Sequence, residues 1–231
     1  GLSSLQLEDK NRGFSFDSKD FLNMEMGINE CSAFNVVNNL DKDRLANIIK
    51  LLGEEKDGKI IANKIDRYRR TKKIETSKEL ASIIKSAKKN NEYKKNPATK
   101  TFQAIRIFVN QELTELTKGL IEATKLLSNG GILVVISFHS LEDKIVKNFF
   151  NIHSNLKKNP SRYLPLKEKN NNLFTSILKK PLLPSAEEIE KNIRSRSAKL
   201  RYAVRNANSF FYQEEFIKKF SHYLNLERSV I

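Results

Sequence analysis

The strongest constraint on the fold is the segment 130–150, GGILVVISFHSLEDKIVKNFF, which predicts a turn, a strand and a helix in direct succession. Gly130 and Gly131 can adopt the backbone angles that a tight connection needs. The unbroken apolar run 132–136 is typical of a strand that is covered on both faces of a parallel sheet. From Leu141 onward, apolar residues recur every fourth position, as on one face of a helix. The segment therefore predicts an α/β fold.

Polar side chains crowd the point where this strand gives way to the helix. Ser137, His139 and Asp143 lie within seven residues of one another. Ser140, with an acidic residue three positions later, predicts the N-cap of the helix. In open α/β sheets, ligands bind at the carboxyl ends of the strands. The sequence therefore predicts a ligand site at this edge of the sheet.

The charge balance points to a polyanionic partner. The 231 residues include 42 Lys and Arg against 27 Asp and Glu, a formal net charge of +15. Such an excess favours a nucleic acid over the alternative, a basic protein with a merely solvated surface. The basic residues are concentrated in residues 56–100. Lys72, Lys73, Lys88 and Lys89 are therefore predicted to bind the nucleic acid.

The cysteine and histidine content and the lack of long apolar runs argue against a disulfide-bonded, a metal-binding or a membrane protein. A single cysteine, Cys31, cannot form an intrachain disulfide, which suits a reducing compartment. His139, His153 and His222 have no ligand spacing, so no metal site is expected. No apolar run has transmembrane length, so we expect no membrane association and a cytoplasmic protein. The chain starts at Gly1 rather than at Met, and we expect a natural N-terminus upstream of it.

Residues 17–96 are predicted to form a compact helical insert. Helices are expected around Val36, from Asp41 to Gly53, around Ile61, and from a capping box at Thr76. Their apolar stripes predict a buried core, with lysine and arginine on the opposite faces.

Residues 97–231 are predicted to complete the sheet. Pro97 opens one long helix whose apolar period continues to Gly130. Strands are expected at 173–178 and 197–204, with a helix beginning after Ser185 between them. Residues 208–224 predict a final amphipathic helix.

Five ordered blocks together resemble one protein family. They are G-L-S-S-L-Q-L at 1–7, R-G-F-S-F at 12–16, P-A-T-K-T-F-Q-A-I-R-I at 97–107, the segment 130–150, and R-S-R-S-A-K-L-R at 194–201. On these blocks the chain is similar to the RsmH/MraW family of bacterial 16S rRNA (cytosine-N4)-methyltransferases.

This resemblance implies a fold, an activity and a division of the chain. The fold is a class I, Rossmann-like methyltransferase sheet with an all-helical inserted domain, here without its N-terminal strands. Residues 1–16 and 97–231 would form the C-terminal part of the methyltransferase domain, and residues 17–96 the insert for RNA recognition. Residues 208–231, which lie outside the resemblance, are predicted from their apolar pattern to form an extra amphipathic tail. The activity is transfer of a methyl group from S-adenosyl-L-methionine to the exocyclic N4 of a cytidine in the 16S rRNA of the small ribosomal subunit.

The resemblance also implies a cofactor edge. Gln6 aligns with the family's cofactor-contacting glutamine, and Ser3 and Ser4 lie on the same loop. The family's glycine-rich loop, of the form D-G-T-x-G-x-G-G-H, does not occur in this chain. We therefore expect these 231 residues alone to bind the cofactor weakly or not at all. The alternative is a non-catalytic, basic RNA-binding protein derived from this fold.

Ser137, His139 and Asp143 are the candidate catalytic residues that the resemblance implies. They would orient the cytosine or take its proton, because the amino group must lose one during transfer. For His139 the competing interpretation is a histidine at a helix entry. For Asp143 it is a carboxylate that interacts with the helix dipole.

Arginines outside the insert are further RNA-binding candidates. Arg106 shares one helical face with Gln103 and Asn110. Arg194 and Arg196 lie in the last block. All three arginines are predicted to contact RNA. The competing interpretation is a merely solvated polar face for Arg106, and structural ion pairing for Arg194 and Arg196.

Overall fold

The computed structural model divides the chain into two compact units. The helical unit comprises residues 2–112 and 223–231, and the sheet unit comprises residues 113–222. The residues that the structure describes are 3, 5–6, 9, 12–27, 31–88, 96–154, 172–211 and 214–228. The units divide at Glu112 and Leu113, whereas the resemblance divides the chain at 96 and 97. The assignment of residues 17–96 to RNA recognition stays a prediction.

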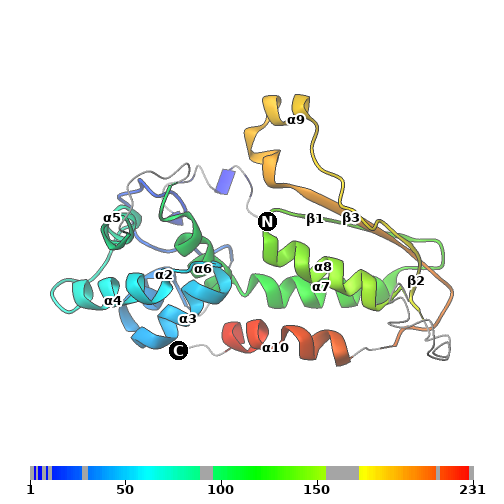
Figure 1. Ribbon diagram of the computed structural model, residues 1–231, viewed down its shortest axis with the longest axis horizontal. Helices are drawn as coiled ribbons and strands as arrows, with labels where there is room; N and C mark the ends of the chain where they lie inside the picture. Colours follow the sequence, from blue (N-terminus) through cyan, green and yellow to red (C-terminus); the bar gives the residue numbers. More distant parts are fainter. Residues whose placement is uncertain are drawn as a thin grey trace. The chain divides into compact units, whose positions relative to one another are not determined.

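The helical unit contains the four helices that were predicted for the insert, followed by a fifth. They are α2 (Ala33–Asn39), α3 (Lys42–Leu52), α4 (Gly58–Arg69), α5 (Ser77–Ala87) and α6 (Thr99–Asn110) (Figure 1). Their starts follow from capping chemistry. The side chain of Asp41 accepts hydrogen bonds from the first turn of α3, and Thr76 forms a capping box with Glu79 at the start of α5.

The core of the helical unit forms around α3. Leu45, Ile48 and Ile49 of this helix are fully buried, and α3 packs against both α4 and α6. Gly53 ends the helix where α6 approaches closely. A Cβ atom at this position would lie 2.4 Å from the carbonyl oxygen of Lys100, so only glycine fits here.

The single long helix predicted from Pro97 to Gly130 is wrong. Gln111 adopts left-handed backbone angles (φ 48°) and separates α6 from α7 (Glu112–Leu126). Its N–H donates to the carbonyls of Ile107 and Phe108, which ends α6. The apolar spacing continues across the break, and this is why the sequence pattern did not show it.

The sheet unit is built on a three-stranded antiparallel sheet. Its strands are β1 (Ile132–Ser137), β2 (Phe174–Ile177) and β3 (Lys199–Arg205), in the order β1-β3-β2. Helix α8 (Ser140–Ile152) packs against all three strands. Figure 1 shows α7 and α8 on the same side of the sheet. The strands predicted at 132–136, 173–178 and 197–204 are confirmed.

The prediction that the first strand is parallel and covered on both faces is wrong for the described residues. Strand β1 pairs only with β3, and the pairing is antiparallel. Ile132, Val134 and Ile136 on one face are 58%, 53% and 55% exposed. A continuous apolar run shows that both faces of a strand are apolar. It does not show which face another helix or strand of the described chain covers.

Aromatic rings bind the helices to the sheet. Phe150 of α8 packs edge-to-face on Phe174 of β2, with ring centroids 5.5 Å apart. Phe149 packs in the same way on Phe216 of α10 (Glu214–Arg228), at 5.2 Å. The predicted C-terminal amphipathic helix is therefore confirmed, and its apolar face is part of a core.

An arm connects β2 to β3. It carries α9 (Ala186–Lys191), which Ser185 caps as predicted, and the short 3₁₀ helix η2 (Ile193–Ser197). None of the described helices combines the length and the apolarity that crossing a bilayer requires.

Candidate active site

Asp143 is held by two cations of the neighbouring strand β3. Its Oδ1 accepts from Nε of Arg201 at 2.7 Å, and its Oδ2 accepts from Nζ of Lys199 at 3.4 Å. Burial alone would raise the pKa of Asp143, but the hydrogen bonds and charges of Arg201 and Lys199 outweigh it and lower the pKa below its ordinary value. A carboxylate in this state is a weak proton acceptor. The geometry favours a structural ion pair that ties the start of α8 to the sheet, and the catalytic assignment stays a prediction.

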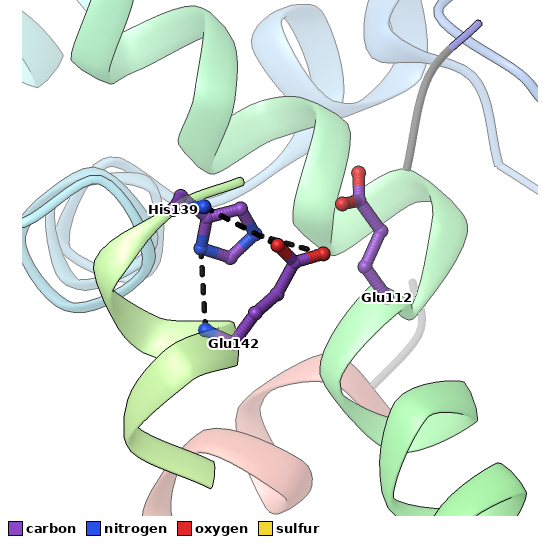
Figure 2. Close-up of side chains that lie close together, drawn as sticks. All are labelled: Glu112, His139 and Glu142. Carbon is purple, nitrogen blue, oxygen red and sulfur yellow. Dashed lines mark hydrogen bonds and ion pairs between the residues drawn. The ribbon is translucent and has the colours of Figure 1, made fainter. Parts of the chain in front are cut away.

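His139, and not Ser140, is the N-cap of α8. Its Nδ1 accepts from the backbone N–H of Glu142, whose carboxylate in turn accepts from the N–H of His139 (Figure 2). The same carboxylate also accepts from the N–H of Phe138. Accepting at Nδ1 places the ring proton of a neutral imidazole on Nε2. The competing interpretation of His139 as a helix-entry histidine therefore describes its contacts, and its catalytic role stays a prediction.

Ser137 lies at the carboxyl end of β1 and is buried. Its hydroxyl donates a long hydrogen bond, 3.4 Å, to the carbonyl of Lys199. Ser137 and Asp143 thus both contact the start of β3. The sequence predicts that Ser137 and Asp143 lie close together because they are only six positions apart. The structure shows in addition that both contact β3.

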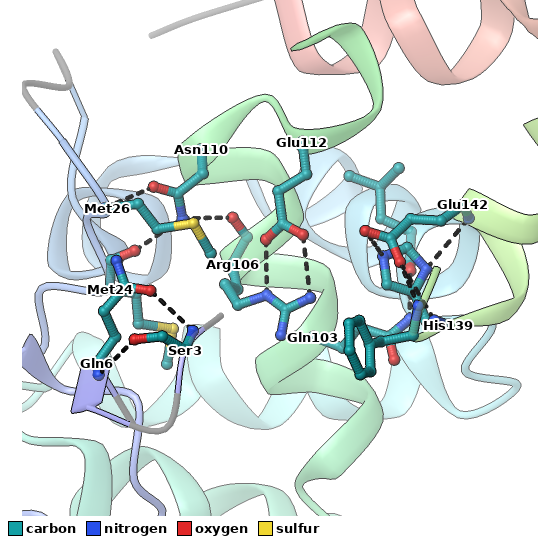
Figure 3. A network of polar contacts seen from close by, with 12 residues as sticks. Ser3, Gln6, Met24, Met26, Gln103, Arg106, Asn110, Glu112, His139 and Glu142 are labelled. Atoms are coloured by element: carbon teal, nitrogen blue, oxygen red, sulfur yellow. Dashed lines mark hydrogen bonds and ion pairs between the residues drawn. The ribbon is translucent and has the colours of Figure 1, made fainter. Parts of the chain in front are cut away.

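The cofactor candidates of the helical unit bond mainly to each other. The N–H of Ser3 donates to Oε1 of Gln6 at 3.0 Å, and the N–H of Gln6 donates to Oγ of Ser3 at 3.2 Å (Figure 3). Ser4 lies outside the described residues. Within the described chain, the amide nitrogen of Gln6 and the hydroxyl of Ser3 both keep donors for a ligand. These few donors alone do not make a cofactor site, and the assignment of Ser3 and Gln6 to cofactor binding stays a prediction.

A small pocket lies within the helical unit, between the loop 14–24 and α6. Its volume is about 150 Å³. It is lined by Phe14, Phe16, Met24, Thr99, Phe102, Gln103 and Arg106. Our sequence predictions assigned a role only to Arg106 in this set. The available signal was that the pocket residues at 14, 16, 99, 102, 103 and 106 all fall in two of the five blocks.

Arg106 is fixed by an acidic partner. Its Nε and Nη2 donate to the two carboxylate oxygens of Glu112, at 2.6 and 3.0 Å (Figure 3). This bidentate pairing orients the guanidinium. Among the described residues, Nη1 of Arg106 has no hydrogen-bond partner. The structure thus shows an ion pair of Arg106 that the sequence analysis did not predict, and it leaves one guanidinium nitrogen for a ligand; RNA contact by Arg106 stays a prediction.

The predicted RNA-binding lysines differ in their exposure. Lys72 and Lys73 are exposed, although Lys72 pairs with Glu79 at 2.7 Å. Lys88 is different, because its side chain is 7% exposed and its Nζ lies 2.6 Å from Glu55, which is itself 5% exposed. This buried ion pair favours a structural role for Lys88, and its assignment to RNA binding stays a prediction. Lys89 lies outside the described residues.

Arg194 and Arg196 are exposed on η2, in the arm between β2 and β3. Their exposure is compatible with RNA contact. Lys199 and Arg201, at the end of the same block, instead form ion pairs with Asp143. These two basic residues therefore have a structural role in the described chain.

Comparison with known proteins places this geometry in a family. The model of the MraW methylase family matches residues 1–206. The chain belongs to the MraW methylase family. Relatives in this family named ribosomal RNA small subunit methyltransferase H include those of Parvibaculum lavamentivorans, 44% identical over 90% of this chain and 61% of the relative, and Afipia carboxidovorans, 45% identical over 90% and 62%. That of Ehrlichia canis is 48% identical over 87% and 66%. This chain spans about three fifths of the length of the first two relatives.

Proposed function

We propose that the full-length protein transfers a methyl group from S-adenosyl-L-methionine to the exocyclic N4 of a cytidine in the 16S rRNA of the small ribosomal subunit. Membership of the MraW methylase family carries the proposal, together with relatives that are named as methyltransferases of small-subunit ribosomal RNA. A ribosomal substrate implies a cytoplasmic protein. The net charge of +15 suits an RNA substrate.

The chemistry sets what the protein must supply. The lone pair on N4 is delocalised into the cytosine ring, so the protein must hold this nitrogen in line with the methyl carbon. As the N–C bond forms, the amino group loses one proton to an acceptor or to water. When bound, the cofactor supplies the methyl group as a sulfonium. Because Ser3 and Gln6 do not form a cofactor site by themselves, we assign no reaction step to cofactor contacts.

Strand β1 supports a larger sheet in the full-length protein. One edge of β1 has no partner among the described strands, and one face exposes Ile132, Val134 and Ile136. Exposed apolar strands with open edges are normally covered or paired. We propose that the Rossmann-like sheet of the family extends from this edge.

Methyl transfer to isolated ribosomal material tests the function. The full-length protein is incubated with a radiolabelled methyl donor and with small subunits, large subunits or deproteinised 16S RNA. We expect label in the RNA of small subunits and none in large subunits. Binding of small-subunit RNA without any methyl transfer would overturn the proposal and favour a non-catalytic RNA-binding protein.

Two exposed lysines of the helical unit provide a prediction about RNA affinity. Replacing Lys72 and Lys73 with glutamine removes two cations that can neutralise phosphates. The slope of log affinity against log salt concentration should then become shallower by about 1 for each phosphate that is no longer neutralised. Fluorescence anisotropy with a labelled 16S fragment at several salt concentrations measures the slope. Lys118→Gln, at an exposed lysine of α7, is the control. A slope equal to that of the control would exclude these lysines as RNA-binding residues.

Lys88→Gln should behave differently from the other lysine variants. It removes the cation from the buried pair with Glu55, while glutamine can still donate one hydrogen bond. We expect the free energy of unfolding to fall by about 2 kcal/mol, with an unchanged salt slope of RNA binding. Urea denaturation and the anisotropy titration measure these two quantities. A shallower slope at wild-type stability would restore Lys88 as an RNA-binding residue.

A further inference from the structure

We propose that the pocket between the loop 14–24 and α6 accepts one unstacked pyrimidine base, whose polar edge is bound by Gln103 and Arg106. This inference rests on the proposed function, because a base that is methylated on its amino group must leave its stack to be reached. It adds the place where the base is held.

The size of the pocket selects a single ring. Its volume is about 150 Å³. An engineered apolar cavity of about 150 Å³ is known to hold benzene, so one six-membered ring fits such a space. Pockets for larger ligands are typically about 300–1,000 Å³. Cytosine or uracil should therefore fit, and a two-ring purine should bind more weakly.

The walls suit the faces of a base. Phe14, Phe16, Met24 and Phe102 form an apolar lining. The rings of Phe16 and Phe102 pack edge-to-face on each other, with their centroids 4.8 Å apart. Extruded bases stack on the faces of aromatic and apolar side chains, which a lining of this composition offers.

Two polar side chains are left with unused hydrogen-bonding capacity. The amide nitrogen of Gln103 makes only a long contact, 3.4 Å, to the carbonyl of Leu52, and within the described chain its amide oxygen has no partner. An amide can both donate and accept, and cytosine offers both kinds of group on its Watson–Crick edge. Nη1 of Arg106 adds a charged donor, held in place by Glu112.

One wall of the pocket is held in a strained conformation. Met24 has φ 60°, which is unusual for a residue with a long side chain. The side chain of Asn110 holds it there, donating to the carbonyl of Met24 at 2.8 Å and accepting from the N–H of Met26 at 2.8 Å (Figure 3). Backbone strain of this kind clusters at ligand sites. The strain is thus a second observation, independent of size and polarity, at the same pocket.

Nucleoside binding tests the inference directly. Saturation-transfer NMR is recorded on the full-length protein with cytidine and with adenosine, which carry no phosphate and so avoid the basic surface. We expect a cytidine signal from wild type that falls at least fivefold in Gln103→Leu and disappears in Gln103→Trp, which fills the pocket. Asn47→Leu, an amide replacement on an exposed position of α3, is the matched control and should keep the signal. Circular dichroism confirms that each variant is folded. An undiminished cytidine signal in both Gln103 variants, or an adenosine signal as strong as that of cytidine, would overturn the inference.

Methyl transfer by the same proteins separates this inference from the proposed function. We expect Gln103→Leu to lower kcat/KM for small subunits about a hundredfold, with wild-type values for Asn47→Leu. Unchanged transfer in Gln103→Leu would reject the pocket while the proposed function stands. If wild type transfers no methyl group, the proposed function fails, and the nucleoside measurement alone decides whether the pocket binds a pyrimidine.

Discussion

Asp143→Asn is expected to lower the free energy of unfolding by about 3 kcal/mol. The variant leaves Arg201, whose side chain is 5% exposed, without its negative partner, and breaking a buried ion pair in this way costs about 3–5 kcal/mol. Lys199 loses the same partner but is more exposed, so it adds little. Urea denaturation of wild type and variant at neutral pH measures the difference. A variant as stable as wild type would show that the ion pair does not stabilise the fold.

The same variant has a defined pH dependence. The pKa of Asp143 is lowered in the folded protein, so its ion pair stabilises the fold above the ordinary aspartate pKa. This stabilisation is lost as the pH falls through the lowered pKa that Asp143 has in the folded protein, because the carboxylate of the unfolded chain binds a proton more readily. The stability difference between wild type and Asp143→Asn should therefore be complete at pH 7 and narrow below about pH 4. A difference that is constant down to pH 3 would contradict this account.

A double variant distinguishes positioning from catalysis. Adding Arg201→Gln to Asp143→Asn removes the unpaired buried cation and should recover more than half of the lost stability. If Asp143 only positions the start of α8, methyl transfer should recover in parallel. If transfer stays at least a thousandfold reduced in the stabilised double variant, Asp143 takes part in the chemistry, as the family resemblance predicts.

Arg205→Met is expected to cost about 4 kcal/mol, the largest loss of stability that we predict. Arg205 is buried on β3, and its guanidinium donates to the carbonyls of Thr124, Leu173, Asn206 and Asn208. Methionine preserves much of the side-chain stem but leaves several of these carbonyls unsatisfied, each at about 1–3 kcal/mol before relaxation and water entry.

Arg196→Met, at an exposed arginine of η2, is the matched control for Arg205→Met and should change stability by less than about 0.5 kcal/mol. Guanidinium denaturation measures both variants. Similar midpoints for the two would show that the buried hydrogen bonds of Arg205 contribute no more than a surface side chain.

Local signals predicted the helices of the helical unit well. Asp41 and the Thr76 capping box mark helix starts through side-chain hydrogen bonds that involve near neighbours only. Such interactions can be identified from a short window of sequence. The break at Gln111 was missed because it depends on one residue with unusual backbone angles in an otherwise continuous apolar pattern.

Long-range features could not be predicted in the same way. The strand 132–137 was correct, but its antiparallel partner and its exposed face depend on residues more than sixty positions away. The ion pairs of Asp143 with Arg201 and of Lys88 with Glu55 also join distant segments. The local excess of basic residues led us to predict that Lys88 binds RNA. That its side chain is buried beside Glu55 can be seen only in the folded structure. The pocket around Gln103 likewise needs two segments that the sequence alone does not bring together.

The identity of the methylated nucleoside tests the central claim most directly. Small subunits are treated with full-length protein and a deuterium-labelled methyl donor, and the 16S RNA is digested to nucleosides for chromatography and mass spectrometry. We expect the labelled methyl group on the exocyclic nitrogen of cytidine, co-eluting with an N4-methylcytidine standard. Label on a ring carbon, on a ribose hydroxyl or on any other base would contradict the account.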